Sequence, residues 1–311
     1  MITEIADTQL KHRIAQVGQL IGNTPLFPIQ RVYQNPKVKI LAKLEWQQLG
    51  SSVKARPAFN IIKDAIDKGK LNSEKSLLDA TSGNTGIAYA AVAAAAGINV
   101  SLCLPENASR ERKTMLKSYG VNIIYTSPFD GTDGAQLEAK SLVEKDPLKY
   151  YYADQYANDN NWLAHYHSTG PEIFQQTDGE VTHFVAGLGT TGTFRGTTTR
   201  LRELNPDIKA VALHPDSAMH GLEGWKHMET AIVPKIYNDQ LADENLLIDS
   251  MEAINLIKDI ARLEGLLVSP SAAANLLGAI KVANSIDEGT VVTVFPDDAS
   301  KYSEVIERLF K

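Results

Sequence analysis

One lysine, Lys54, lies among small and hydroxyl residues directly before a stretch with the apolar pattern of a helix. The pattern predicts a helix because apolar residues recur at helical spacing, namely Ala58, Ile61, Ile62, Ala65 and Ile66. Pro57 suits the first turn of this helix, and Gly69 suits its end. The positive end of the helix dipole disfavours another positive charge, which favours the neutral amine that Schiff-base chemistry needs. Taken alone, the segment is also compatible with an ordinary surface lysine.

A glycine-rich run, Gly187–Thr193, follows a predicted strand and precedes a helical stretch that runs towards Leu204. Glycines allow the backbone to approach a ligand, and N–H groups at a helix N-terminus bind phosphate. The run also satisfies the G-x-G-x-x-G fingerprint, which makes an NAD-dependent dehydrogenase the natural alternative. That fingerprint needs an acidic residue at the end of the next strand, where this chain has His214. The three threonines of the run instead suit a compact monophosphate.

A third segment, Thr81–Gly86, is also predicted at a strand end and a helix start. Hydroxyl and N–H groups in this position would bind a carboxylate, although a simple helix cap is also compatible with the segment. A reactive lysine, a phosphate loop and a carboxylate loop together describe an enzyme that binds an amino acid through an aldehyde cofactor with a phosphate. Pyridoxal phosphate meets all three requirements.

Short apolar strands alternate with helices along most of the chain. Strands are predicted at residues 38–44, 76–80, 98–104, 121–125, 181–186, 208–213 and 290–295. Further helices are predicted at residues 87–96, 134–145 and 251–264, and from an N-cap at Ser109 to Tyr119. This alternation indicates an α/β protein with parallel sheets and right-handed crossovers. The length of 311 residues allows two lobes or one large domain.

The composition excludes several classes of function. The net charge is −6 and no basic run is present, which argues against nucleic acid as a partner. Residues 1–16 form a polar leader of mixed charge, unlike a targeting peptide, and the apolar run at residues 87–96 is too short to span a membrane. A cytoplasmic protein is therefore expected. Cys103 is expected to be a buried strand thiol. His165 and His167 are two apart and would face the same way if the segment were extended, but no further metal ligands lie nearby, so both are expected to be structural.

The chain resembles the cysteine synthase (O-acetylserine sulfhydrylase) and cystathionine β-synthase family of fold-type II pyridoxal phosphate enzymes, from about Leu20 to Tyr302. The motifs that carry the resemblance occur in the family's order and are Leu20–Leu26, Ser52–Lys54, Thr81–Gly86, Leu104–Asn107, Thr169–Glu172 and Gly187–Thr193. The most similar branch is CysM-like, especially the type that uses O-phosphoserine and a thiocarboxylated carrier protein.

The resemblance implies a tryptophan synthase β-like fold of two lobes, each with a mostly parallel sheet flanked by helices. The larger, phosphate-binding lobe would comprise residues 1–44 and 150–311. The smaller, movable lobe would comprise residues 45–149 and would carry the asparagine loop at Thr81–Gly86.

The resemblance also assigns roles to individual residues. Lys54 would carry the cofactor as a Schiff base and later move the Cα proton. The remaining cofactor contacts would be Asn84 to the ring hydroxyl, Ser271 to the pyridine nitrogen, and Gly189, Thr190, Thr191, Gly192 and Thr193 to the phosphate. The substrate carboxylate would be held by Thr81, Ser82, Thr85 and Gln155. Because Ser271 is neutral, the ring would be a weak electron sink, which suits β-elimination.

Several positions depart from the family's pattern. Ala55 replaces an aspartate, Ser269–Ala274 replaces Gly-Ile-Ser-x-Gly-Ala, and His214 replaces a glutamate. None of these changes removes a bond-breaking group, but they leave the substrate and the ease of domain closure open. Lys226 falls where the O-phosphoserine branch places an arginine, so it would either pair with a leaving phosphate or be a solvated loop lysine.

The predicted reaction is a β-replacement that makes L-cysteine from O-acetylserine or O-phosphoserine and sulfide or a thiocarboxylate, through an aminoacrylate intermediate. Another nucleophile would give cystathionine or 2,3-diaminopropionate. Two alternatives belong to other classes, an NAD-dependent dehydrogenase and a non-catalytic regulator. The departures from the family's pattern motivate the regulator, and the retention of Lys54 argues against it. The resemblance implies a homodimer with an amino-acid substrate and, in the O-phosphoserine branch, a sulfur-carrier protein as partner. No metal, nucleic-acid partner or membrane partner is expected.

Overall fold

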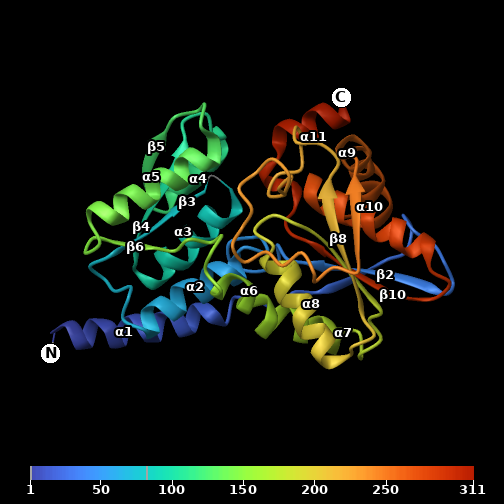
Figure 1. The fold of residues 1–311 in the computed structure, drawn as a ribbon, viewed down its shortest axis with the longest axis horizontal. Helices are drawn as coiled ribbons and strands as arrows, with labels where there is room; N and C mark the ends of the chain where they lie inside the picture. The colour runs from blue at the N-terminus through green and yellow to red at the C-terminus, as the bar shows by residue number, and fades with distance from the viewer. Residues whose placement is uncertain (1, 82) are drawn as a thin grey trace. The chain divides into compact units, whose positions relative to one another are not determined.

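The computed structural model describes residues 2–81 and 83–311, which form two compact units. The first unit comprises the chain up to Ile21, Gln48–Gly50 and Lys54–Asn161, and the second comprises Gly22–Gln47, Ser51–Val53 and Trp162–Lys311. Each unit has its own sheet and its own apolar core (Figure 1). No helix of the described residues has both the length and the apolar character needed to cross a membrane.

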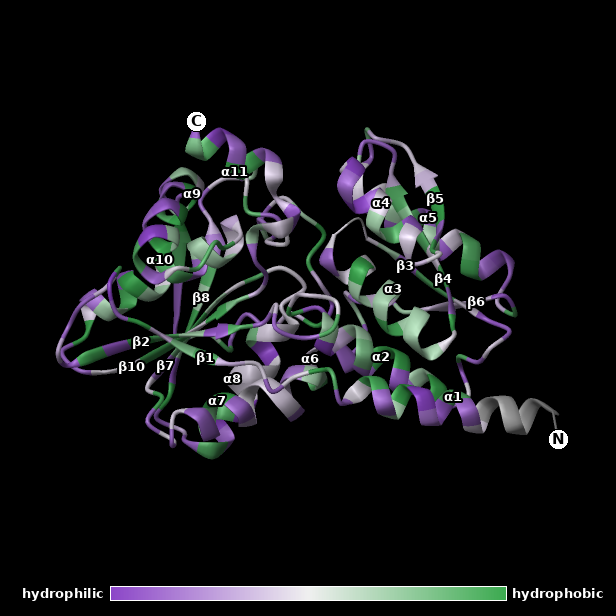
Figure 2. Ribbon diagram, turned by 180° about the vertical axis from the view of Figure 1, so that it is seen from behind, coloured by the Kyte–Doolittle hydropathy of each residue, from purple (hydrophilic) through white to green (hydrophobic). Residues whose placement is uncertain are grey.

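The first unit is built on a four-stranded parallel sheet in the order β5-β4-β3-β6. The strands are β3 (Ser76–Ala80), β4 (Asn99–Pro105), β5 (Asn122–Thr126) and β6 (Tyr150–Tyr152). Its helices are α1 (Ile2–Gly18), α2 (Ala55–Asp67), α3 (Asn84–Ala96), α4 (Arg110–Ser118) and α5 (Gly131–Lys145). Neighbouring residues of β3 face opposite sides of the sheet, so Leu77 packs in the core with α2 and α3, and Leu78 packs with α5. Figure 2 shows α3 as apolar along its length, as expected of a helix that is buried on nearly all sides.

The second unit is built on a six-stranded sheet in the order β1-β2-β10-β7-β8-β9, in which β1 is antiparallel to β2 and the other pairs are parallel. The strands are β1 (Leu26–Ile29), β2 (Val38–Leu44), β7 (His183–Gly187), β8 (Lys209–Pro215), β9 (Glu244–Ile248) and β10 (Gly289–Phe295). Helices α9 (Ser250–Asp259) and α10 (Pro270–Ser285) cover one face, and α7 (Gly170–Gln176) and α8 (Gly192–Leu204) cover the other (Figure 1). The remaining elements of the chain are α6 (Asn160–Ala164), the π-helices η1 (His165–Thr169) and η2 (Ile260–Glu264), the 3-10 helix η3 (Ala299–Lys301) and α11 (Ser303–Phe310).

The α/β class is confirmed, and each strand predicted from the sequence is present with its ends within two residues of the prediction. Cys103 is buried on β4 as predicted, and burial raises the pKa of its thiol to about 12. The segment described from the sequence only as a polar leader is helix α1, whose Leu10, Ile14 and Val17 are buried in the core with α2 and α3. The helix predicted to reach residue 264 changes into the π-helix η2 after Asp259. Ser109 precedes α4, but its side chain makes no capping hydrogen bond.

The compact units differ from the expected lobes in four segments, because residues 45–47 and 51–53 of the expected smaller lobe also belong to the second unit. The chain up to Ile21 belongs to the first unit, because α1 packs against α2 and α3. Residues 150–161 also belong to the first unit, because β6 pairs with β3 in its sheet.

Candidate active site

Lys54 occupies the N-cap position of α2, immediately before the first helical residue, and is half-buried. The three residues that precede it belong to the second unit and are held there by hydrogen bonds. The Ser51 carbonyl oxygen accepts from Lys301 Nζ at 2.7 Å, and the Val53 N–H donates to the Pro296 oxygen at 2.7 Å. The backbone that leads into Lys54 is therefore fixed on its N-terminal side.

The asparagine loop joins the end of β3 to the start of α3. Thr81 is buried, and its hydroxyl accepts a hydrogen bond from the Gly83 N–H at 3.3 Å. Asn84 and Thr85 are the first two residues of a 13-residue helix, where N–H groups and the helix dipole favour an anion. Ser82, which is also predicted to bind the substrate carboxylate, lies outside the described residues.

Thr85 and Gln155 come together although they are 70 positions apart, with the Thr85 hydroxyl donating to Gln155 Oε1 at 2.7 Å. The Gln155 backbone is held on both sides. Its N–H donates to Asp79 Oδ2 at 3.4 Å, and its carbonyl oxygen accepts from Asn161 Nδ2 at 2.6 Å. The two side chains are therefore adjacent, as a shared carboxylate pocket requires.

Asp79 is a residue that reasoning from the sequence missed. It is 1% exposed on β3, two residues before Thr81. Burial raises the pKa of its carboxyl to about 7, although the Ala80 N–H, which donates to Oδ1 at 2.8 Å, lowers it. The available signal was an acidic residue inside the apolar strand Ser76–Ala80. The charge of Asp79 therefore changes near neutral pH next to the backbone of Gln155.

The glycine-rich run joins β7 to α8, and close packing requires two of its glycines. A Cβ at Gly187 would overlap the Trp225 ring, and a Cβ at Gly189 would overlap the carbonyl oxygen of Gly224. Thr191 occupies the N-cap position of α8 with a φ of 72°. The backbone of this loop is therefore packed tightly against the loop that carries Gly224.

Hydroxyl groups line the same loop. Thr190 Oγ1 accepts from the Gly192 N–H at 3.5 Å, and Thr193 Oγ1 lies 3.2 Å from His165 Nε2. Thr191 Oγ1 is buried and has no hydrogen-bond partner in the described part of the chain. A buried hydroxyl without a partner is costly, and a bound anion would remove that cost. The loop, at the N-terminus of a 13-residue helix, therefore fits a phosphate.

Ser271 is buried in the first turn of α10, with its Oγ 3.1 Å from Oγ of Ser269. One turn later, Asn275 accepts from the Gly187 N–H at 2.8 Å and donates to the Val294 oxygen at 2.6 Å. Asn275 thus connects the helix of Ser271 to the start of the phosphate loop. Reasoning from the sequence missed Asn275, because a single amide in an apolar helix belongs to no motif.

Lys226 is half-buried in the segment after β8. Its N–H donates to the Leu188 oxygen at 2.8 Å, and its Nζ donates to the Ile232 oxygen at 3.2 Å. The backbone of Lys226 is therefore adjacent to the phosphate loop, while its ammonium group contacts a backbone carbonyl. His214, at the end of β8, contacts Asn245 through Nε2 at 2.9 Å.

His165 and His167 lie on the π-helix η1 and not on an extended segment, so they do not share one face. The histidines point to different environments, because His165 is 1% exposed and His167 is exposed. Among the residues that the structure describes, no three histidine, cysteine, aspartate or glutamate side chains are grouped so that they could hold a metal ion.

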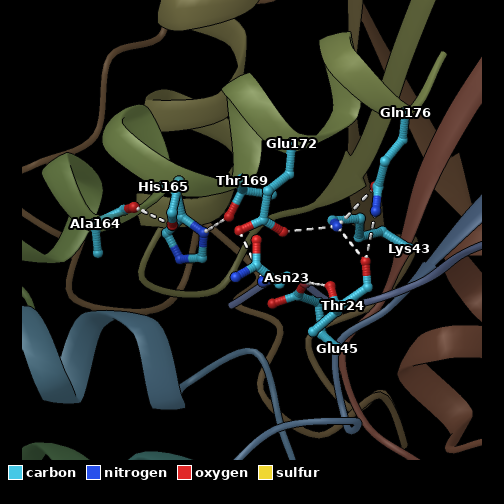
Figure 3. Close-up of polar contacts among 10 residues, drawn as sticks. Asn23, Thr24, Lys43, Glu45, Ala164, His165, Thr169, Glu172 and Gln176 are labelled. Carbon is cyan, nitrogen blue, oxygen red and sulfur yellow. Dashed lines mark hydrogen bonds and ion pairs between the residues drawn. The ribbon is translucent and has the colours of Figure 1, made fainter. Parts of the chain in front are cut away.

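A buried ion pair in the second unit joins two of the sequence motifs (Figure 3). The Lys43 side chain is fully buried, with Nζ 2.7 Å from Glu172 Oε2, and it donates to the Thr24 carbonyl oxygen at 2.6 Å. The Asn23 N–H donates to the other Glu172 oxygen at 3.0 Å. The opening motif and the Thr169–Glu172 motif are therefore in direct contact.

The model of the pyridoxal-phosphate dependent enzyme family matches residues 17–297 of the chain. The chain belongs to this family. It is 43% identical over 91% of its length to a cysteine synthase of Aquifex aeolicus, of which it covers 89%. It is 36% identical over 93% of its length to an O-acetylserine dependent cystathionine β-synthase of Bacillus subtilis, of which it covers 96%. The crystal structure of a cysteine synthase from Entamoeba histolytica matches with a TM-score of 0.88 at 31% identity, covering 94% of this chain and 90% of that one.

These comparisons confirm the family, the fold type and the cofactor predicted from the motifs. The protein is a pyridoxal-phosphate dependent enzyme of the cysteine synthase type. The alternatives of an NAD-dependent dehydrogenase and of a non-catalytic regulator are set aside. The closely packed glycines of the loop and the buried Thr191 hydroxyl, which has no hydrogen-bond partner among the described residues, are compatible with binding the phosphate of this cofactor.

Proposed function

We propose that this family member makes L-cysteine by replacing the β-substituent of an activated serine with sulfur. The observation that carries the proposal is the combination of a phosphate cradle in one unit with an adjacent Thr85–Gln155 pair in the unit that carries Lys54. The similarity to cysteine synthases over nine-tenths of the chain supports the choice of reaction.

Each part of the cofactor has a proposed partner. Lys54 Nζ would bond to the aldehyde carbon, Asn84 would contact the ring hydroxyl, and Ser271 would face the ring nitrogen. The phosphate would be bound by Gly189, Thr190, Thr191, Gly192 and Thr193. When bound, pyridoxal phosphate withdraws electrons from Cα of the amino acid, which allows the Cα proton and the β-substituent to leave.

The residues of the chain bind the substrate and move its proton. Thr81, Ser82 and Gln155 would bind the carboxylate through hydroxyl and amide hydrogens, which fixes the orientation of Cα. Thr85, whose hydroxyl donates to Gln155, would contribute its backbone N–H at the start of α3. Lys54 Nζ would take the Cα proton as a general base and return it after sulfur has added. The C–O bond to acetate or phosphate breaks, the C–S bond to hydrosulfide forms, and no oxidant is needed.

Lys226 bears on the choice of leaving group. Its backbone N–H donates to Leu188, next to the proposed phosphate loop, and a cation here would pair with the leaving phosphate if the substrate is O-phosphoserine and not O-acetylserine. With O-phosphoserine, a thiocarboxylated carrier protein is the proposed sulfur donor. A homodimer, which the resemblance implies, and a cytoplasmic location, which the sequence of residues 1–16 suggests, complete the proposal.

A second candidate uses homocysteine as the nucleophile and gives cystathionine. The Bacillus subtilis relative favours it, because that protein is named for this product and is 36% identical to the chain.

Product analysis separates the candidates. The purified protein with pyridoxal phosphate is incubated with O-acetylserine or O-phosphoserine and with sulfide or homocysteine, and the amino acids are identified by mass spectrometry. Cysteine from sulfide is expected. Cystathionine without cysteine would favour the second candidate, and neither product would contradict both.

A further inference from the structure

A chain of three polar side chains leads from the first turn of α8 into the π-helix η1. Thr193 Oγ1 lies 3.2 Å from His165 Nε2, and the other ring nitrogen, Nδ1, lies 2.8 Å from Thr169 Oγ1. His165 and Thr169 are 1% and 0% exposed. Figure 3 shows the Thr169 hydroxyl directed at the imidazole ring. The imidazole therefore has a hydroxyl partner on each of its nitrogens.

Two glycines allow the close approach that this chain needs. A Cβ at Gly196 on α8 would overlap the Trp162 carbonyl oxygen and would lie 2.8 Å from Cβ of His165. A Cβ at Gly170 would lie 2.8 Å from Cβ of Arg200. Helix α8 and the π-helix can thus pack backbone against backbone, which brings His165 within reach of Thr193. π-helical turns are rare and are frequent at functional sites, which also singles out this segment.

The far end of the chain is fixed by the buried ion pair. Thr169 is the N-cap residue of α7, and Glu172 lies in the first turn of the same helix. Glu172 is held by Lys43 at 2.7 Å and by the Asn23 N–H at 3.0 Å (Figure 3). Because these contacts anchor the first turn of α7, they also fix the position of Thr169.

The chemistry of phosphate decides the direction of the hydrogen bonds. A phosphate dianion only accepts hydrogen bonds, so a threonine that binds it must use its single O–H for the phosphate. Thr193 can then only accept from His165, which places the ring proton on Nε2 and leaves Nδ1 to accept the O–H of Thr169. We propose that His165, oriented by Thr169, is a positioning residue that holds the Thr193 hydroxyl as a donor to the cofactor phosphate. This inference rests on the proposed phosphate-binding role of Thr193.

Two amide substitutions separate the roles of the two ring nitrogens. His165→Gln extends an amide N–H towards the position of Nε2 and keeps a donor for Thr193. His165→Asn reaches only as far as Nδ1 and removes that donor. The dissociation constants of pyridoxal phosphate and of pyridoxal, which lacks the phosphate, are measured on the full chain by the quenching of tryptophan fluorescence.

We expect His165→Asn to weaken pyridoxal phosphate binding by about ten- to a hundredfold, the range for a hydrogen bond to a charged group, and to leave pyridoxal binding unchanged. His165→Gln should stay within about threefold of the parent protein. His167→Asn, which changes the exposed histidine two residues away, is the matched control and should change neither constant.

Equal losses for pyridoxal phosphate and pyridoxal, or an unaffected His165→Asn protein, would overturn the proposal. If His165→Asn does not fold, Thr169→Val provides the second test, because the ring is then free to carry its proton on Nδ1. A smaller loss, confined to pyridoxal phosphate, supports the proposal, and no loss contradicts it. Failure to make cysteine would leave this result standing, because the measurement follows cofactor binding and not turnover.

Discussion

The two units offer their proposed anions different kinds of site. In the first unit, the carboxylate site is made of side chains, with Thr85 and Gln155 paired at 2.7 Å and the buried Asp79 behind them. In the second unit, the phosphate site combines threonine hydroxyls with a tightly packed backbone, in which Gly187 and Gly189 lie at positions that cannot accept a Cβ. A side-chain site can be tuned by protonation or by conservative substitution, whereas a tightly packed backbone site tolerates no added atom.

The largest effect is expected from replacing Lys54, which belongs to the first unit. Lys54→Ala removes both the covalent partner of the cofactor and the general base, so the rate of cysteine formation should fall by about 10⁴-fold or more. Lys63→Ala, which changes a partly exposed lysine on the same helix, is the control. A Lys54→Ala protein as active as this control would show that the chemistry lies elsewhere.

The next effect is a pH dependence of stability that Asp79 gives to the first unit. Below pH 3.8 the carboxyl is protonated in both states, and between pH 3.8 and about 7 the unfolded chain ionises first, so stability falls as the pH rises. At about 1.4 kcal/mol per pKa unit, the loss is up to about 4 kcal/mol. Asp79→Asn should remove it. Urea unfolding at pH 5 and pH 8 measures the difference between the two proteins.

Asp243 in the second unit provides a control of opposite sign. Partial burial raises the pKa of its carboxyl. The Ala210 N–H and the Arg202 guanidinium together lower this pKa by more than burial raises it, so the net shift is downward. Asp243→Asn should therefore lose stability at pH 5 and above, where the carboxylate is charged. If the free energy of unfolding changed with pH in the same way in the parent protein and in Asp79→Asn, the assignment of a raised pKa to Asp79 would be contradicted.

A smaller effect is expected from one added methyl group in the backbone site. Gly189→Ala places a Cβ where the Gly224 carbonyl oxygen lies, so the loop must move, and we expect affinity for pyridoxal phosphate to fall by about a hundredfold. Gly221→Ala is the matched control in the same unit, because its Cβ would meet only Ile254 Cδ1 at 3.5 Å. If Gly189→Ala and Gly221→Ala bound pyridoxal phosphate with equal affinity, the proposed difference between a tightly packed backbone site and a side-chain site would not hold.

The smallest effect is expected from a conservative change in the side-chain site. Thr85→Val removes the donor to Gln155 Oε1, so KM for the amino-acid substrate should rise by about tenfold. The dissociation constant of pyridoxal phosphate should not change. A variant that lost cofactor affinity and kept its KM would place Thr85 in the wrong half of the site.

Local sequence patterns were sufficient to predict the segments of the candidate site that lie at strand ends. The lysine before a helix and both loops follow from apolar periodicity and glycine placement, because ligand-binding loops follow strands in parallel sheets. The contacts Asp79–Gln155, His165–Thr193 and Asn275–Gly187 could not be predicted in this way. They join residues 76, 28 and 88 positions apart, and packing alone brings them together. Gln155 itself was identified only through the family resemblance.

The visible absorbance of the purified holoenzyme, titrated with O-acetylserine and separately with O-phosphoserine, tests the β-replacement most directly. The predicted result is a cofactor band that shifts with one of the two serine derivatives and returns when sulfide is added, with release of L-cysteine. A band that neither derivative moves would contradict the reaction and would indicate another amino-acid substrate for the same cofactor.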